Sequence, residues 1–390
     1  MRTVSSFVCI LLFTLCAYPA GASPRHPMTS ARAGAIEAAV LAGLARTGGK
    51  GIAVAVIEDG RPVLVRAYGV RDKAGAPLTT DTLLHGASLT KTVFAYTVLR
   101  LRDEGKLDLD RPIASLLARP LPEYGNLPHG MGNWGDLEGD SRWARITPRM
   151  ALTHSTGFAN FAFLEPDQRL RIHFEPGSRY AYSGEGLLLL QFGVEQRLGH
   201  GIDQDARRLT FGPLGMRNTS LMWHDDPGVP VSQSWDQAGR AFEHHRSGRV
   251  RAAGSMDTTI EDMSRFAAAL VNGTNLSPRT HADMLRPQRA ITTASQFPTL
   301  QPELAPERRR PDLSAGLGLV TFSGPQGRGF FKGGHDDTTA NTMVCVRAGR
   351  RCAVLLGNDV RIEALFPTLV AAILGETGAP WRWEYPEQFR

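Results

Sequence analysis

The sequence predicts an α+β fold in which helices flank an antiparallel β-sheet built from both ends of the chain. Three observations lead to this prediction. β-rich runs occur near the N-terminus and again near the C-terminus, helical patterns accompany both sets, and the segment between them is rich in glycine, proline and short helical pieces. Strands from both ends that bracket an inserted, mostly helical region indicate one sheet covered by helices. A chain of 390 residues is long enough to bury a large core.

The first β-rich run, residues 51–69, predicts a hairpin. Asp59 and Gly60 at its centre are typical of a two-residue turn, and Pro62 indicates an edge strand or a bulge. The next segment predicts a helix that ends at Gly105, because three apolar residues share one helical face: Phe94, Val98 and Leu101. This helix would have Ser88 at or near its N-terminus.

The chain returns to β structure after the predicted insert. A helix with a capped start at Thr259-Ile260-Glu261-Asp262 precedes three β-rich runs. The last helix carries one apolar stripe made of Ile362, Leu365, Phe366, Leu369, Val370 and Ile373. We expect one domain, residues 23–390, whose α/β part comprises 31–111 and 254–380 and whose helical insert covers about 112–253.

Residues 1–22 are typical of an export signal. Arg2 is followed by an apolar run from Val4 to Tyr18, and the small residues Ala20 and Ala22 precede the expected cleavage site. The run is shorter than a membrane-spanning helix requires, and no later apolar stretch is longer. We therefore expect a periplasmic or secreted protein, cleaved after Ala22, with no stable membrane insertion; an uncleaved anchor is the alternative.

The charge and the cysteines also restrict the interpretation. The formal net charge of +6 is spread along the chain without interleaved aromatic residues, which favours a solvated surface over nucleic-acid binding. Outside the predicted signal, Cys345 and Cys352 flank a turn centred on Ala348 and Gly349. We expect a disulfide between them. Because a two-residue turn would put the pair at an awkward hydrogen-bonded position, two free buried thiols are the alternative.

Ser88 and Lys91 are the first candidate catalytic residues. Their spacing is about one helical turn, so the lysine amine can reach the serine hydroxyl and take its proton. The free N–H groups and the dipole at a helix N-terminus would stabilise negative charge and lower the pKa of Lys91. The spacing alone is weak evidence, because a capping serine followed by a surface lysine gives the same pattern.

Two later motifs strengthen the interpretation. Tyr182-Ser183 and Lys332-Gly333-Gly334 follow in that order, the second on a predicted C-terminal strand. Ser-x-x-Lys, Tyr-Ser-x and Lys-x-Gly in this order resemble the serine β-lactamase and penicillin-binding protein superfamily. The sequence is most similar to its branch of class C β-lactamases, D-alanyl carboxypeptidases and esterases. The resemblance covers most of the mature chain and implies a β-lactamase/transpeptidase-like fold.

The resemblance also implies a role for each motif residue. Ser88 is the expected acylated nucleophile, and Lys91 its proton-shuttling partner. Tyr182 is the expected general acid/base, with nearby cations stabilising its phenolate. Lys332 is expected to supply one such cation and to orient a substrate carboxylate. The backbone N–H groups of Ser88 and His335 are expected to form the oxyanion hole.

The third motif has two possible registers. The register that begins at Lys332 has the required glycine at Gly334. The other reads His335-Asp336-Asp337 as the His-x-Gly variant of the branch and gives the electrostatic role to His335. We favour the lysine register because it contains that glycine.

Two departures from the family pattern bear on the substrate. The motif reads Tyr182-Ser183-Gly184, so Gly184 stands where the branch usually has the asparagine of Tyr-x-Asn, and Gly333 stands where a hydroxyl side chain would bind a β-lactam carboxylate. Both departures favour esterase or peptidase activity over efficient β-lactamase activity. Glu185 is a weaker candidate for a water-activating base, and His154 is expected to be structural. His244-His245 and Asp336-Asp337 do not predict a metal site, because adjacent residues on a strand point to opposite faces.

We therefore expect an exported serine hydrolase that acts through an acyl-enzyme on an amide or ester, such as a β-lactam, a D-amino-acid peptide or a small ester. The alternative is a non-catalytic protein of the same fold that binds peptidoglycan or β-lactams. The expected partner is a small-molecule or peptide substrate, and no cofactor or metal is expected. The sequence does not indicate an oligomeric state.

Overall fold

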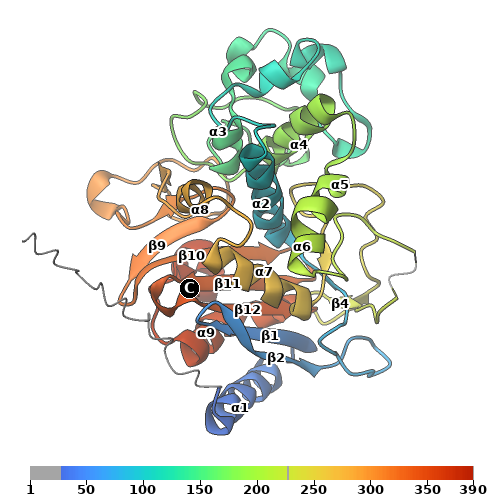
Figure 1. Cartoon of the computed structure of the whole chain (residues 1–390), viewed down its shortest axis with the longest axis vertical. Helices are drawn as coiled ribbons and strands as arrows, with labels where there is room; N and C mark the ends of the chain where they lie inside the picture. The colour runs from blue at the N-terminus through green and yellow to red at the C-terminus, as the bar shows by residue number, and fades with distance from the viewer. Residues whose placement is uncertain (1–27, 226–227, 390) are drawn as a thin grey trace, which may run out of the picture.

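The computed structural model describes residues 28–225 and 228–389, so the predicted signal, residues 1–22, lies outside the described residues. At its centre is an antiparallel sheet with the strand order β2-β1-β12-β11-β10-β9-β8-β7 (Figure 1). The strands are β1 (Gly51–Glu58), β2 (Arg61–Gly69), β7 (Arg289–Ala290), β8 (Ser314–Ala315), β9 (Val320–Gly324), β10 (Gly327–His335), β11 (Ala340–Val346) and β12 (Arg351–Gly357). β1 pairs directly with β12, so both ends of the chain build one sheet and the predicted fold class is confirmed.

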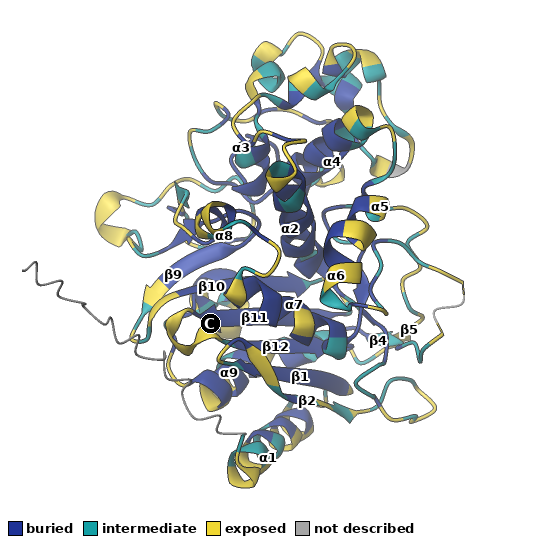
Figure 2. Cartoon of the chain, in the orientation of Figure 1, coloured by how far each residue is buried: buried dark blue, intermediate teal, exposed yellow. Residues whose placement is uncertain are grey.

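Helices cover both faces of this sheet (Figure 1). On one face lie α2 (Thr90–Asp103) and α7 (Ile260–Asn272), and on the other lie α1 (Ser30–Thr47) and α9 (Phe366–Leu374). The side chains of β1 alternate between two core clusters, with Ala53, Ala55 and Ile57 in one and Ile52, Val54 and Val56 in the other. Both faces of the central strands are buried, so β1 and β12 are apolar along most of their length (Figure 2).

The predicted N-terminal hairpin is present. β1 and β2 are joined by Asp59 and Gly60, whose φ angles of 48° and 72° are typical of a type I′ turn. The register shifts between Val56 and Ile57, opposite Pro62, and β2 is the edge strand. The edge strand and the bulge that Pro62 indicates are therefore both present.

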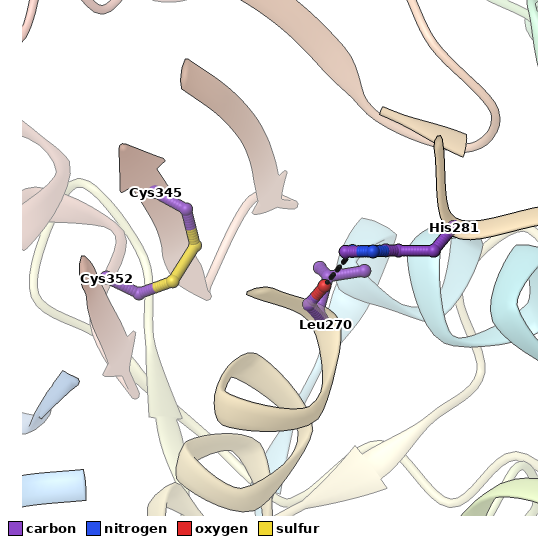
Figure 3. The surroundings of a disulfide bond; sticks show 4 residues. All are labelled: Leu270, His281, Cys345 and Cys352. Atoms are coloured by element: carbon purple, nitrogen blue, oxygen red, sulfur yellow. Dashed lines mark hydrogen bonds between the residues drawn. A yellow bond between two sulfur atoms is a disulfide. The ribbon is translucent and has the colours of Figure 1, made fainter. Parts of the chain in front are cut away.

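Helix α7 begins and ends with local hydrogen bonds. Thr259 caps its start by accepting the N–H of Asp262 at 3.2 Å, as the sequence predicts. Near its end, His281 of α8 (Pro278–Met284) donates its Nε2–H to the carbonyl of Leu270 at 2.8 Å (Figure 3). These bonds satisfy backbone groups that a helix end leaves without partners.

A disulfide joins Cys345 of β11 to Cys352 of β12 (Figure 3). Strand pairing ends at Val346 and Arg351, so the turn is residues 347–350 and is longer than the expected two residues. The two cysteine Cα atoms are 4.1 Å apart, a spacing typical of a non-hydrogen-bonded pair. The prediction that the cysteines occupy a hydrogen-bonded position is therefore wrong. The geometric argument against a disulfide, which depended on that position, no longer applies.

The segment between the two halves of the sheet is made of short helices, turns and two small sheets. Its helices are α3 (Pro148–Leu152), α4 (Gly184–Leu198), α5 (Ile202–Ala206) and α6 (Gly212–Leu214). Short strands pair as β4 (Ser234–Trp235) with β5 (Ala241–Phe242), and as β3 (Leu84–His85) with β6 (Asp257–Thr258). The chain ends in α10 (Trp381–Glu384) and a last turn. None of the helices in the described part of the chain combines the length and the apolar character needed to cross a membrane.

Candidate active site

Ser88 lies in a 3-10 turn, Ala87–Leu89, that leads directly into α2. Ala87 has a φ of 44°, a conformation that is strained for a residue with a side chain. Thr90 Oγ1 holds this turn by donating to the Ala87 carbonyl at 2.6 Å and accepting the N–H of Met256 at 3.1 Å. In the described structure no side-chain hydrogen bond caps the start of α2, and the Ser88 hydroxyl instead faces two other side chains.

Lys91 is the first of these neighbours. Its Nζ lies 2.9 Å from Ser88 Oγ and donates to the Ala253 carbonyl at 2.5 Å. The side chain is enclosed, since only 1% of the residue is exposed. Burial lowers the pKa of Lys91 well below its usual value, and the charges of Lys332 and Arg251 lower it further. The amine is therefore disposed to be neutral, the form that can accept a proton.

Tyr182 is the second neighbour of the serine. It lies just before α4, and its hydroxyl donates to Ser88 Oγ at 2.9 Å. His154 packs on the tyrosine ring with the ring centroids 4.5 Å apart, and its Nδ1 accepts the N–H of Ser183 at 3.2 Å. Burial raises the pKa of Tyr182 although the hydrogen bond with Ser88 opposes the shift. Both Lys91 and Lys332 lie near the tyrosine ring, at 4.9 and 5.2 Å from its centroid, so the expected nearby cations are present.

Lys332 of β10 completes the polar cluster. Its Nζ lies 3.4 Å from the Tyr182 hydroxyl and 5.2 Å from the centroid of that ring. Burial lowers the pKa of Lys332 to about 8, while the carboxylate of Glu384 acts in the opposite direction. The lysine is thus a buried group that titrates much nearer to neutral pH than an exposed lysine does.

Gly334 permits the close approach of β10 to the serine turn. A Cβ atom on this residue would lie 2.9 Å from the Gly86 carbonyl oxygen and 2.9 Å from the Leu89 nitrogen. Both of these neighbours are backbone atoms, so a side chain here would push the strand away from Ser88. The glycine that the lysine register requires therefore has a steric reason in the structure.

His335 ends β10 and is only partly buried. Its Nδ1 forms an ion pair with Glu363 at 2.8 Å. Burial acts to lower the pKa of this histidine, but Glu363 outweighs burial and the net shift is upward. Lys332, the first residue of the lysine register, lies close to Tyr182. His335, the first residue of the other register, instead has its ring paired with a carboxylate.

Ser88, Tyr182 and Lys332 border a cavity of about 220 Å³. Its lining residues are Ser88, Asn160, Phe161, Tyr182, Gln296, Phe297, Lys332, Gly333, His335 and Glu384. Neither Asn160 nor Glu384 belongs to a readable motif, so the sequence alone does not indicate them. Asn160 Oδ1 accepts the N–H of Gly184 at 3.0 Å, and Glu384 enters the cavity from the C-terminal helix α10.

The weaker candidates have other partners. Glu185 is buried, and its Oε1 accepts the N–H of Ala162 at 2.9 Å. Ser183 caps α4 by accepting the N–H of Gly186 at 3.0 Å, and its hydroxyl donates to the Ala159 carbonyl at 2.8 Å. His244 Nε2 lies 2.9 Å from Asp257, and among residues 28–225 and 228–389 no group of three or more side chains is arranged to hold a metal ion.

The chain is similar in sequence to known proteins. The family model described as Beta-lactamase matches residues 36–368. Esterase EstB of Burkholderia gladioli is 28% identical over 314 residues, which cover 74% of this chain and 76% of the esterase. A D-aminopeptidase of Gluconobacter oxydans is 27% identical over 195 residues, 48% of this chain and 35% of that protein.

Solved structures share the fold at lower sequence identity. The D-alanine carboxypeptidase AmpC of Burkholderia cenocepacia matches with a TM-score of 0.69 and 19% identity, over 88% of this chain and 99% of that chain. A class C beta-lactamase matches with a TM-score of 0.70 and 16% identity, over 90% of this chain and 99% of that chain. The family model spans well over half of the chain, and Ser88 Oγ lies within hydrogen-bonding distance of both Lys91 and Tyr182. The chain therefore belongs to the beta-lactamase family of serine hydrolases.

Proposed function

We propose that this protein is an exported hydrolase that cleaves an ester or amide through an acyl-enzyme on Ser88. The observation that carries the proposal is that Ser88 Oγ lies 2.9 Å from both Lys91 Nζ and the Tyr182 hydroxyl. A serine becomes a nucleophile when a neighbouring base takes its proton, and burial lowers the pKa of Lys91, which favours the neutral amine that can act as this base. The substrate is a small ester, a D-amino-acid peptide or a β-lactam, and removal of residues 1–22 accompanies export.

In the acylation step, the Ser88 oxygen attacks the substrate carbonyl carbon and its proton passes to Lys91 Nζ. Tyr182 donates its proton to the leaving oxygen or nitrogen as the scissile bond breaks, and Lys91 returns a proton to Tyr182. Water then attacks the carbonyl carbon of the acyl ester, and Lys91 Nζ takes a proton from this water. The acid product leaves, and the proton returns to Ser88.

The oxyanion that forms on the substrate is assigned to the backbone N–H groups of Ser88 and His335. Strand register supports this assignment. The N–H of Arg347 bonds to the carbonyl of Arg328, so alternate residues of β10, His335 among them, direct their N–H groups away from β11. Pairing of β10 with β9 ends at Phe331, which leaves this N–H free of a strand partner on its other side.

The competing function is a non-catalytic binder of peptidoglycan or β-lactams. A binder needs the cavity but has no need of a base and an acid that both contact the serine hydroxyl. The arrangement of Lys91 and Tyr182 therefore favours turnover.

The test follows covalent labelling and turnover together. Wild type, Ser88→Ala and Ser178→Ala are treated with short-chain nitrophenyl esters, a chromogenic cephalosporin and a fluorescent penicillin, and intact mass is recorded. Ser178 is an exposed serine close to Tyr182 in the sequence and is the matched control. We expect an acyl mass or turnover in wild type and Ser178→Ala, and neither in Ser88→Ala. Labelling that persists in Ser88→Ala would contradict the proposal, and binding of the penicillin without acylation would favour the binder.

A further inference from the structure

Glu384 occupies the place that a hydroxyl side chain would take in the third motif. A Cβ atom on Gly333 would overlap Glu384 Oε1 and would lie 2.8 Å from the hydroxyl of Tyr385. Residue 333 is therefore a glycine because the C-terminal segment fills the space above it. The glycine in the motif therefore leaves the room that the carboxylate in the cavity occupies.

The C-terminal segment is firmly held in this position. The Trp383 carbonyl accepts the N–H of Gln296 at 2.9 Å, and the Trp383 indole N–H donates to Thr293 at 3.3 Å. The ring of Tyr385 packs edge-on against Phe366 of α9. Glu384 is thus presented to the cavity by packed neighbours on both sides.

The carboxylate of Glu384 has an unused acceptor. The residue is 3% exposed, it lines the cavity together with Ser88 and Lys332, and its Oε2 has no hydrogen-bond partner among the described residues. A buried acceptor without a partner is costly, so the site favours a ligand that brings a donor. Burial raises the pKa of Glu384, while the positive charge of Lys332 acts in the opposite direction.

We infer that Glu384 is a specificity-determining residue that excludes a substrate carboxylate from the Lys332 end of the cavity and selects an ester or amide bearing an N–H or O–H donor there. The inference rests on the proposed function, because it needs Ser88 to be acylated. A carboxylate next to Lys332 would face a carboxylate already present, and like charges in an enclosed site repel strongly. A carboxamide, a hydroxyl or an amine would instead bind Glu384 Oε2.

The test uses aryl acetates that differ in one group of the leaving phenol. The substrates are 3-acetoxybenzamide and 3-acetoxybenzoate, and kcat/KM is measured for each with wild type, Glu384→Gln and Glu387→Gln. Glu387→Gln removes the same charge from an exposed residue of the same segment. In wild type we expect a carboxamide-to-carboxylate ratio of kcat/KM of about tenfold or more, retained in Glu387→Gln and lowered at least about tenfold in Glu384→Gln.

The outcomes separate the inference from the function beneath it. If Ser88 is acylated by both esters and the ratio is the same in Glu384→Gln as in wild type, the inference is overturned while the hydrolase remains. If neither ester acylates Ser88 in any of the three proteins, the proposed function fails and the inference fails with it. The wild type alone also tests which of the two esters is preferred. A higher kcat/KM for the carboxylate than for the carboxamide overturns the inference even if Glu384→Gln does not fold.

Discussion

Replacing Lys332 by methionine should change how the stability of the protein depends on pH. Burial lowers the pKa of Lys332 from 10.5 to about 8 in the folded protein, whereas the unfolded chain exposes the amine to water. Between these two values the unfolded state binds more protons than the folded state. The free energy of unfolding must therefore rise with pH in this window. Methionine has a similar length and carries no titratable group, so this contribution is absent from the variant.

The magnitude follows from the two pKa values. Between about pH 7 and about pH 9.5, the titration of Lys332 should add about 2 kcal/mol to the free energy of unfolding of the wild type. Urea unfolding followed by circular dichroism at several pH values measures this, with wild type and Lys332→Met in the same buffers. The wild-type curve should rise by that amount relative to the variant. Lys73→Met, which removes an exposed lysine, should instead run parallel to the wild type. Parallel curves for wild type and Lys332→Met would refute the reasoning.

Two further predictions concern the strand and the disulfide near the site. Gly334→Ala should slow acylation of Ser88 at least about tenfold, because its Cβ would press on backbone atoms of the serine turn and displace the reacting groups. Gly248→Ala is the matched control, since a Cβ there meets nothing within 4 Å; single-turnover mass spectrometry compares the two, and equal rates in both variants would contradict the close approach. The double variant Cys345→Ala/Cys352→Ala should lower the free energy of unfolding by about 2 kcal/mol, because the bridge restricts the unfolded chain. The same variant should keep the wild-type acylation rate, since neither cysteine lines the cavity; urea unfolding without a loss of stability would speak against this role of the bridge.

Local patterns in the sequence predict those parts of the fold and the site that local interactions determine. The turn at Asp59 and Gly60, the cap at Thr259 and the position of Ser88 before a helix all depend on residues close together in the chain. The resemblance to a family then predicts that Tyr182 and Lys332 belong to one site. In the structure Tyr182 lies beside the serine, and Lys332 lies beside Tyr182.

The parts that the sequence did not reveal depend on tertiary contacts. Glu384 stands in a tail without a motif, and its significance appears only where the tail meets Gly333. The sequence indicates the cations near Tyr182, but it does not reveal that the side chain is buried, and burial raises its pKa. The hydrogen-bonding position of the cysteine pair was predicted wrongly because the turn between β11 and β12 is longer than the two residues expected from its glycine.

The pairing of β1 with β12 has a consequence for the order in which the protein can become active. The first strand of the described chain, β1, must wait for the last strand, β12, before the middle of the sheet can close. The wall of the cavity is completed later still, by Glu384. During synthesis the Ser-x-x-Lys pair therefore exists long before the strand and the helix that enclose it. A polypeptide that is released early lacks its central sheet, so hydrolysis begins only with the finished molecule.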